Sequence, residues 1–199
     1  SVATDAHRLA LAKTPLNERV SDQVTGIVPR KSINEIGKIV SDNNDNILIQ
    51  LTPNSINVSV SGTTFSSKLI EGKFPDYEQV IPTGDSSTLL INKKDLSESL
   101  SRVSVLSSEK FRGVRMITSD NLINISANNP EKEQAEESIA CTYAGESIDI
   151  AFNVNYIQEI LSCIDDENVE IHFFGSDKSC LITSSGSQEF KYVVMPLLI

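Results

Sequence analysis

The chain has 199 residues, 39% of them hydrophobic and 22% charged, which is enough apolar matter for a packed core and excludes wholesale disorder. Its apolar stretches are far shorter than the ~20 residues of a membrane-spanning helix. Its three cysteines lack CxxC spacing, which argues against a disulfide scaffold or a zinc site and favours a reducing, cytoplasmic setting. The net charge of -10 argues against a nucleic-acid ligand unless cations gather on one surface.

Strand-like and helix-like periods alternate along the chain. The sequence predicts a first strand over residues 2–13 and then three helices with apolar residues on one face. Polar residues with capping spacing precede these helices, and we expect Ser32, Asn92 and Asn155 to be their N-caps. The helices are expected around residues 33–40, 96–103 and 157–164, and the paired strands after them at 46–51 and 56–60, 114–118 and 122–127, and 168–174 and 180–183.

One helix and about four strands therefore recur at a period of roughly 60 residues. A repeating unit of one helix and about four strands predicts an α+β fold in which antiparallel sheets carry helices on one face. Two such units form a pseudo-symmetric domain, so we expect residues 83–199 to be one complete domain and residues 1–82 to be the C-terminal part of another. Because the first residue falls inside a unit and is not Met, the chain is expected to be the C-terminal part of a longer protein.

Few residues offer catalytic chemistry. Asp5, His7 and Arg8 form the one cluster of that kind, and a small hydrolase using Asp5 and His7 is the alternative that they leave open. On a strand, Asp5 and His7 would share one face and Arg8 would lie on the other. His172 is expected on the solvent face of a strand, and no motif for phosphate, nucleotide or metal binding occurs.

Charged and apolar clusters point instead to binding surfaces. Basic residues gather on the first two expected helices, either as ordinary solvated faces or as a surface for a polyanion. Residues 131–137 form an acidic run, which can be a solvated loop or can protect a strand edge. The apolar end, residues 192–199, leaves a sheet at Pro196 and would suit the lining of a groove. A structural repeat protein without a DNA role also stays open.

Several strings, spread in order over the whole chain, make it recognisable. They are Ala-Thr-Asp-Ala-His-Arg-Leu-Ala at 3–10, Phe-Pro-Asp-Tyr at 74–77, Glu-Lys-Phe-Arg-Gly-Val-Arg at 109–115, Ala-Asn-Asn-Pro-Glu at 127–131, Phe-Asn-Val-Asn-Tyr at 152–156 and Tyr-Val-Val-Met-Pro at 192–196. In these strings the chain resembles the bacterial DNA polymerase III beta subunit family, the replicative sliding clamps.

The resemblance implies the DNA clamp fold and a non-catalytic role in DNA replication. Clamps of this family form a ring of two protomers, a homodimer, with helices lining the hole and sheets outside. The ring encircles duplex DNA without reading its sequence and gives the polymerase processivity. No cofactor or metal is implied, and polymerases and the clamp loader are the implied peptide partners.

The resemblance also implies a hydrophobic peptide-binding groove between the middle and last domains. Its residues, carried over by position, are Thr4, Ala6, His7, Arg8, Leu9, Pro75, Gln79, Val80, Asn153, Tyr156, Asp177, Ser179, Val193, Val194, Met195, Pro196 and Leu197. This chain departs from the family pattern at Ala6, usually Gly, at Gln79, often basic, at Asp177, often apolar, and at Leu198, which replaces a basic residue.

Two further surfaces are implied by the same resemblance. The DNA-facing residues would be Arg30, Lys31, Lys38 and Arg102. The dimer interface would use Val105, Leu106, Glu131, Glu133, Glu136 and Glu137. An acidic outer surface with cations confined to the hole would reconcile the net charge with DNA binding.

Overall fold

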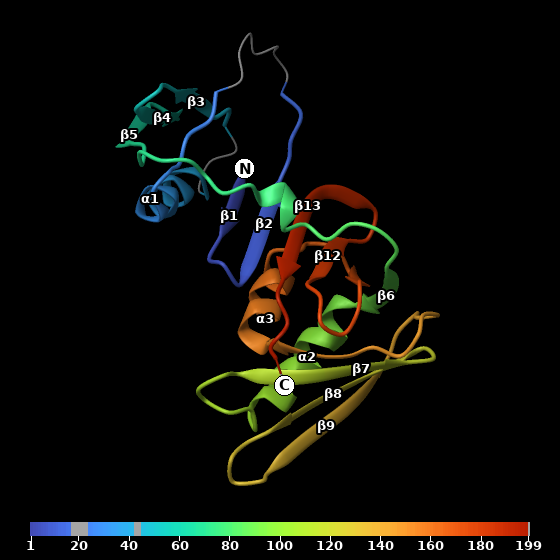
Figure 1. The fold of residues 1–199 in the computed structure, drawn as a ribbon. Helices are drawn as coiled ribbons and strands as arrows, with labels where there is room; N and C mark the ends of the chain where they lie inside the picture. Colours follow the sequence, from blue (N-terminus) through green and yellow to red (C-terminus); the bar gives the residue numbers. More distant parts are fainter. Residues whose placement is uncertain (17–23, 42–44, 199) are drawn as a thin grey trace. The chain divides into compact units, whose positions relative to one another are not determined.

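The computed structural model describes residues 1–16, 24–41 and 45–198 (Figure 1). The chain divides into two compact units, one made of Ser1–Pro15 with Tyr77–Ile199 and the other of Leu16–Asp76. The expected domain boundary near residue 82 stays a prediction. A strand from the first fifteen residues pairs with the C-terminal strand in the larger unit, the one that contains Tyr77–Ile199. No local sequence pattern could reveal this long-range pairing.

The larger unit contains a six-stranded antiparallel sheet in the order β1-β2-β13-β12-β11-β6. Its strands are β1 (Val2–Thr4), β2 (Arg8–Ala12), β6 (Ser87–Asn92), β11 (Asn168–Phe173), β12 (Cys180–Ser184) and β13 (Ser187–Val194). The single strand expected over residues 2–13 is wrong, because a tight turn at residues 5–7 splits it into the β1–β2 hairpin.

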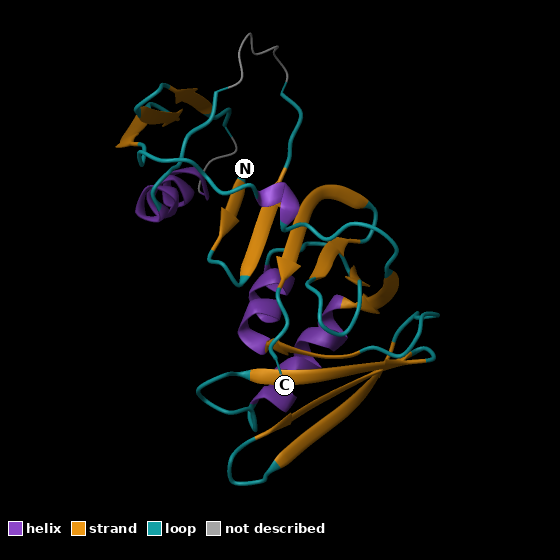
Figure 2. Cartoon of the chain, viewed as in Figure 1, coloured by secondary structure: helices purple, strands orange, loops and turns teal. Residues whose placement is uncertain are grey.

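A second, four-stranded sheet in the same unit has the order β10-β7-β8-β9. It comprises β7 (Gly113–Ser119), β8 (Leu122–Asn128), β9 (Gln134–Ala140) and β10 (Asp149–Asn153). Helices α2 (Lys93–Ser104) and α3 (Val154–Ser162) pack on each other and on strands of both sheets (Figure 2). The two sheets therefore share one helical layer, which is the α+β arrangement that the sequence predicts.

The core of the larger unit forms where the predicted apolar faces meet. Leu96, Leu100 and Val103 from α2 are fully buried beside Ile157 and Leu161 from α3. Alternate residues of the strands, such as those of β11, complete this core. Burying a side chain of this size contributes about 1.5–3 kcal/mol.

The ends of the helices confirm one predicted N-cap and correct two. Asn92 caps α2, where its side chain accepts the N–H groups of Lys94 and Asp95. The cap of α3 is Asn153 rather than Asn155, because the helix begins at Val154, before the apolar residues that predicted it. Ser32 lies inside its helix, where its hydroxyl hydrogen-bonds that of Ser67 at 2.7 Å.

The smaller unit has one helix and a three-stranded antiparallel sheet. Its elements are α1 (Arg30–Ser41), β3 (Leu48–Leu51), β4 (Ser55–Val60) and β5 (Thr63–Lys68), in the sheet order β3-β4-β5. Ile56, Val58 and Val60 are buried, whereas Ile33 on α1 is 51% exposed. Among the described residues of the whole chain, no helix has both the length and the hydropathy needed to cross a bilayer.

Candidate functional site

The turn between β1 and β2 holds two of the predicted groove residues, Ala6 and His7, and is fixed by the side chains of Thr4 and Asp5. The Asp5 carboxylate accepts the backbone N–H groups of His7 and Arg8 at 3.1 and 3.0 Å. The Thr4 hydroxyl donates to the Arg8 carbonyl at 2.7 Å. Ala6 has a φ of 73°, a left-handed conformation that costs an L-residue roughly 1 kcal/mol and that glycine adopts freely.

Asp5 and His7 do not form the dyad that a hydrolase would need. Among the described residues, no hydrogen bond joins the Asp5 carboxylate to the His7 imidazole, and the side chain of Asp5 instead binds Arg8 at 3.0 Å. The imidazole stacks beside the ring of Tyr156, with ring centroids 6.3 Å apart and the ring planes inclined by 22°. Nor do three or more His, Cys, Asp or Glu side chains gather into a metal site in the described part of the chain.

The C-terminal segment after β13 lies beside this turn. Val193 pairs with Leu9 and Val194 with Arg8 in the sheet, and the N–H of Met195 donates to the His7 carbonyl at 3.0 Å. Beyond Pro196 the chain crosses to the second sheet, where Leu197 N–H donates to the Ala151 carbonyl at 2.8 Å. Backbone hydrogen bonds to the β1–β2 turn and to β10 therefore hold residues 195–197 in place.

An apolar cluster lies on the face of the six-stranded sheet opposite the helices. Leu9, Leu11 and Val193 are its buried members, because alternate residues of a strand point to opposite faces and Tyr192 and Val194 belong to the main core. The partly buried residues that pack on the cluster are Val2, Tyr77, Ile81 and Leu181. Tyr77 begins the short 3-10 helix η1 (Tyr77–Gln79).

Two predicted groove residues expose apolar side chains near these elements. Val80, directly after η1, is 45% exposed, and Met195, directly after β13, is 46% exposed. Leu9 and Val193 are buried, so they can support a binding surface but offer little of their own area to a ligand, and Val194 is buried in the main core on the other face.

The remaining predicted groove residues are distributed over several elements. Asn153 caps α3 and Tyr156 lies in its first turn, half-buried. Asp177 and Ser179 lie in the loop between β11 and β12, and Gln79 ends η1. Pro75 belongs to the smaller unit.

The residues assigned to DNA and to the dimer interface include an ion pair. The guanidinium of Arg102, on α2, binds the Glu137 carboxylate of the edge strand β9 through two bonds of 2.6 and 2.8 Å. This bonding lowers the pKa of Glu137 to about 2 and raises that of Arg102. Val105 is 77% exposed beyond the end of α2, and Glu131, Glu133 and Glu136 are exposed.

The other three residues assigned to DNA all lie on α1. Arg30 and Lys31 are exposed in its first turn, and Lys38 forms an ion pair of 2.9 Å with Glu35.

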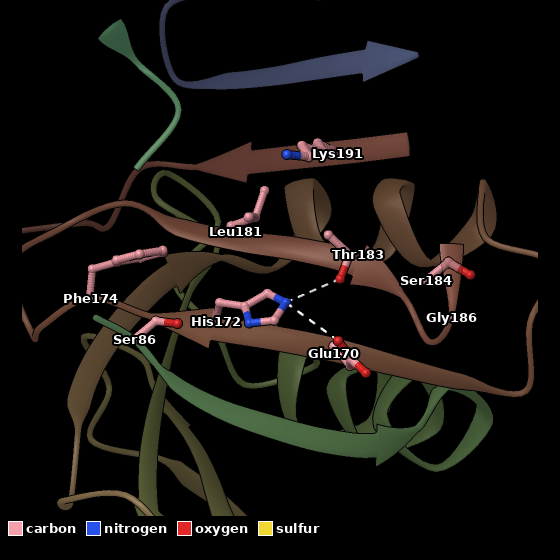
Figure 3. Close-up of a pocket in the computed structure, with 9 residues that line it drawn as sticks. All are labelled: Ser86, Glu170, His172, Phe174, Leu181, Thr183, Ser184, Gly186 and Lys191. Carbon is pink, nitrogen blue, oxygen red and sulfur yellow. Dashed lines mark hydrogen bonds and ion pairs between the residues drawn. The ribbon is translucent and has the colours of Figure 1, made fainter. Parts of the chain in front are cut away.

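A pocket of about 380 Å³ opens on the sheet around His172 (Figure 3). As expected, His172 lies on the face of β11 that points away from the core residues Val169, Ile171 and Phe173, and its side chain is 20% exposed. Its ring nitrogens lie 2.9 Å from the Thr88 hydroxyl and 3.2 Å from the Thr183 hydroxyl. Burial, together with the charge of Lys191, lowers the pKa of His172 despite the carboxylate of Glu170. None of the predicted groove residues is among the described residues that line this pocket.

Sequence reasoning missed Glu159, which contacts a predicted groove residue directly. Its carboxylate lies 2.7 Å from Nη1 of Arg8, across 151 positions of sequence. Its one signal was its place on the same helix as Tyr156, one turn further along.

Comparison with known proteins matches both parts of the chain. Residues 78–198 match the family model for the C-terminal domain of the DNA polymerase III beta subunit, and residues 1–76 match the model for its central domain. The beta sliding clamps of Pseudomonas aeruginosa and Escherichia coli K12 are each 39% identical over 197 residues, which cover 99% of this chain and 54% of each relative. The chain therefore spans about half the length of these relatives.

Solved structures agree in fold. The DNA polymerase sliding clamp from Pseudomonas aeruginosa aligns with a TM-score of 0.96 at 38% identity, covering 100% of this chain and 54% of that one. The Caulobacter crescentus pol III beta aligns with a TM-score of 0.92 at 31% identity, covering 100% and 53%. The fold is thus the DNA clamp fold, and because one family model alone covers more than half of the sequence, the chain belongs to the DNA polymerase III beta subunit family, the sliding clamps.

Proposed function

We propose that the protein containing this chain is a non-catalytic processivity factor of DNA replication in the cytoplasm. It encircles duplex DNA as a homodimeric ring and holds the polymerase through a peptide-binding groove. The observation that carries this proposal is the match of the chain to both the central and the C-terminal clamp domains. The hydrolase alternative lacks an Asp5–His7 dyad, and family membership disfavours a repeat protein without a DNA role.

The groove is formed by the β1–β2 turn, η1, α3 and the segment after β13. Exposed apolar atoms of Val80 and Met195 would receive aliphatic or aromatic anchors of a linear peptide from a polymerase or the clamp loader. The stacked rings of His7 and Tyr156 would form a wall beside them. The buried cluster around Leu9 and Val193 would support this surface from below.

Tethering explains how such a protein acts without a catalytic group. A polymerase attached to a ring that cannot leave the DNA rebinds its template as an intramolecular partner, at a high effective concentration. Tight, sequence-specific DNA contacts would oppose sliding, whereas phosphate contacts position the duplex without fixing it to one sequence.

The cations proposed to face DNA differ in how much free charge they offer. Arg30 and Lys31 are exposed at the start of α1. Lys38 and Arg102 each have a carboxylate partner, Glu35 and Glu137 respectively, which compensates part of their charge. Arg30 and Lys31 should therefore contribute most to the salt dependence of DNA contact.

The proposed dimer interface lies on the larger unit at α2 and β9. Val105 supplies an exposed apolar side chain, with Leu106 beside it, and the acidic residues 131, 133 and 136 supply negative charge. Glu137 is occupied by Arg102, so it would shape this surface rather than pair with a second protomer.

Retention on circular DNA tests the ring. The full-length protein, loaded onto nicked circular duplex DNA, should stay bound through a high-salt wash and be lost once the circle is cut. Loss of the protein from uncut and cut DNA alike would contradict a topological link.

Peptide binding tests the groove. Val80→Ala and Met195→Ala should each weaken binding of a labelled peptide with leucine and phenylalanine anchors by about ten-fold, as expected when a buried contact worth over 1 kcal/mol is lost. Fluorescence anisotropy with the 199-residue chain measures this. Leu122→Ala is the matched control, since Leu122 is also 45% exposed but lies at the start of β8. Equal affinities for all four proteins would reject the groove.

A further inference from the structure

The guanidinium of Arg8 contacts three side chains. Its Nε lies 3.0 Å from the Asp5 carboxylate, and its Nη1 lies 2.7 Å from the Glu159 carboxylate. Its Cζ lies 4.4 Å from the centroid of the Tyr156 ring, within the range of a cation–π contact. Arg8 thus connects the β1–β2 turn to α3.

The electrostatics favour this arrangement. Burial opposes the charge of Arg8, but the bonds to Glu159 and Asp5 outweigh it and raise the pKa of Arg8. Burial likewise opposes the charge of Asp5, but the His7 N–H and the Arg8 guanidinium lower its pKa. Asp5 and Arg8 are therefore both charged around neutral pH.

The contacts of Arg8 constrain the ring wall of the proposed groove. Tyr156 has Arg8 over its face and His7 stacked beside it. The carbonyl of His7 in turn accepts the N–H of Met195. Tyr156 also packs against the main core, so a shift of the guanidinium would remove one of the contacts that orient its ring.

We propose that Glu159 is a positioning residue for the peptide groove: it holds the Arg8 guanidinium over Tyr156 and so presets the Tyr156–His7 wall. Asp5 orients the other edge of the same guanidinium and also closes the turn through backbone N–H groups. The Glu159 side chain only orients the guanidinium and does not close the turn. Because it is also 65% exposed, replacing it should leave the fold intact. This inference rests on the proposed peptide-binding function.

The test uses Glu159→Gln and a labelled, uncharged peptide with leucine and phenylalanine anchors. Because the peptide has no charge, salt acts on its affinity mainly through ion pairs within the protein. At low salt the variant should bind about two- to five-fold more weakly than wild type, the range expected of an exposed ion pair. Raising the salt from about 0.01 M to about 1 M shortens the screening length from ~30 to ~3 Å. The ratio of the two affinities should then approach one.

Three controls separate positioning from a general effect on structure. Glu98→Gln removes a paired glutamate of similar exposure, 52%, from α2 and should bind like wild type at every salt concentration. Arg8→Lys keeps the charge but loses the planar fork, so it should bind as weakly as Glu159→Gln or more so. Thermal unfolding should show Glu159→Gln folded like wild type.

The outcomes are distinguishable. Equal affinities of wild type and Glu159→Gln at low salt, or a deficit that salt does not remove, would overturn the role of Glu159 and leave the groove standing. Failure of the wild-type chain to bind the peptide at all would instead reject the proposed groove.

Discussion

Arg102 and Glu137 illustrate how much a single residue's role depends on its partner. The family resemblance implied two separate surfaces for them, one for DNA and one for a second protomer. The structure joins them in a two-bond pair between α2 and β9. Sequence could not predict that pairing, because 35 positions separate the two residues and no helical or strand spacing relates them.

The Arg102–Glu137 pair predicts a low pKa for Glu137 and a contribution to stability that depends on pH. The pKa of Glu137 falls from its ordinary 4.5 to about 2 because Arg102 bonds its ionised form. A lowered folded-state pKa means that the pair stabilises the fold above about 4.5 and that this contribution disappears as the pH falls through about 2. An NMR titration of the Glu137 side-chain carboxyl should therefore show a midpoint near the lower value.

Arg102→Gln is the control for this titration. Without the guanidinium, the midpoint of Glu137 should return toward the ordinary 4.5. A wild-type midpoint already near 4.5 would mean that the pair does not persist in solution.

At the scale of elements, periodicity predicted what packs in the core and failed where the chain turns locally. Leu96, Leu100 and Val103 share a helix face in the sequence and are buried together. The β1–β2 hairpin was missed because its turn contains no glycine, and Ala6 adopts the left-handed conformation that Gly usually supplies. Local contacts of Thr4 and Asp5 with the turn backbone replace that signal.

The helix caps follow the same logic. Before α2, Asn92 is the one polar residue with the spacing of an N-cap, and it is the cap in the structure. Before α3, Asn153 and Asn155 compete, and apolar spacing alone favoured the later one. For the groove, the family resemblance supplied Arg8 and Tyr156, but only the fold brings Glu159 to them.

At the scale of the whole chain, family boundaries and folding units do not coincide. The central-domain match covers residues 1–76, yet β2 lies between β1 and β13 in the sheet of the C-terminal unit. Ser1–Pro15 therefore shares its hydrogen bonds with residues from the other end of the chain. The two units also differ in core size, since β4 supplies the three buried apolar residues of the described part of the smaller one.

Native-state hydrogen exchange can tell which division governs unfolding. A unit with a small core opens at a lower free energy than one with a large core, because less apolar surface opposes its opening. Amides of β2 should therefore exchange together with those of β13 and clearly more slowly than amides of β4. The pairing of Val193 with Leu9 and of Tyr192 with Ala10 is the physical reason, since β2 cannot separate from the sheet without exposing Leu9 and Leu11. Exchange of β2 with the faster rate of β4 would instead mean that residues 1–15 open with the rest of the central-domain sequence, and the contact-based division would then be wrong.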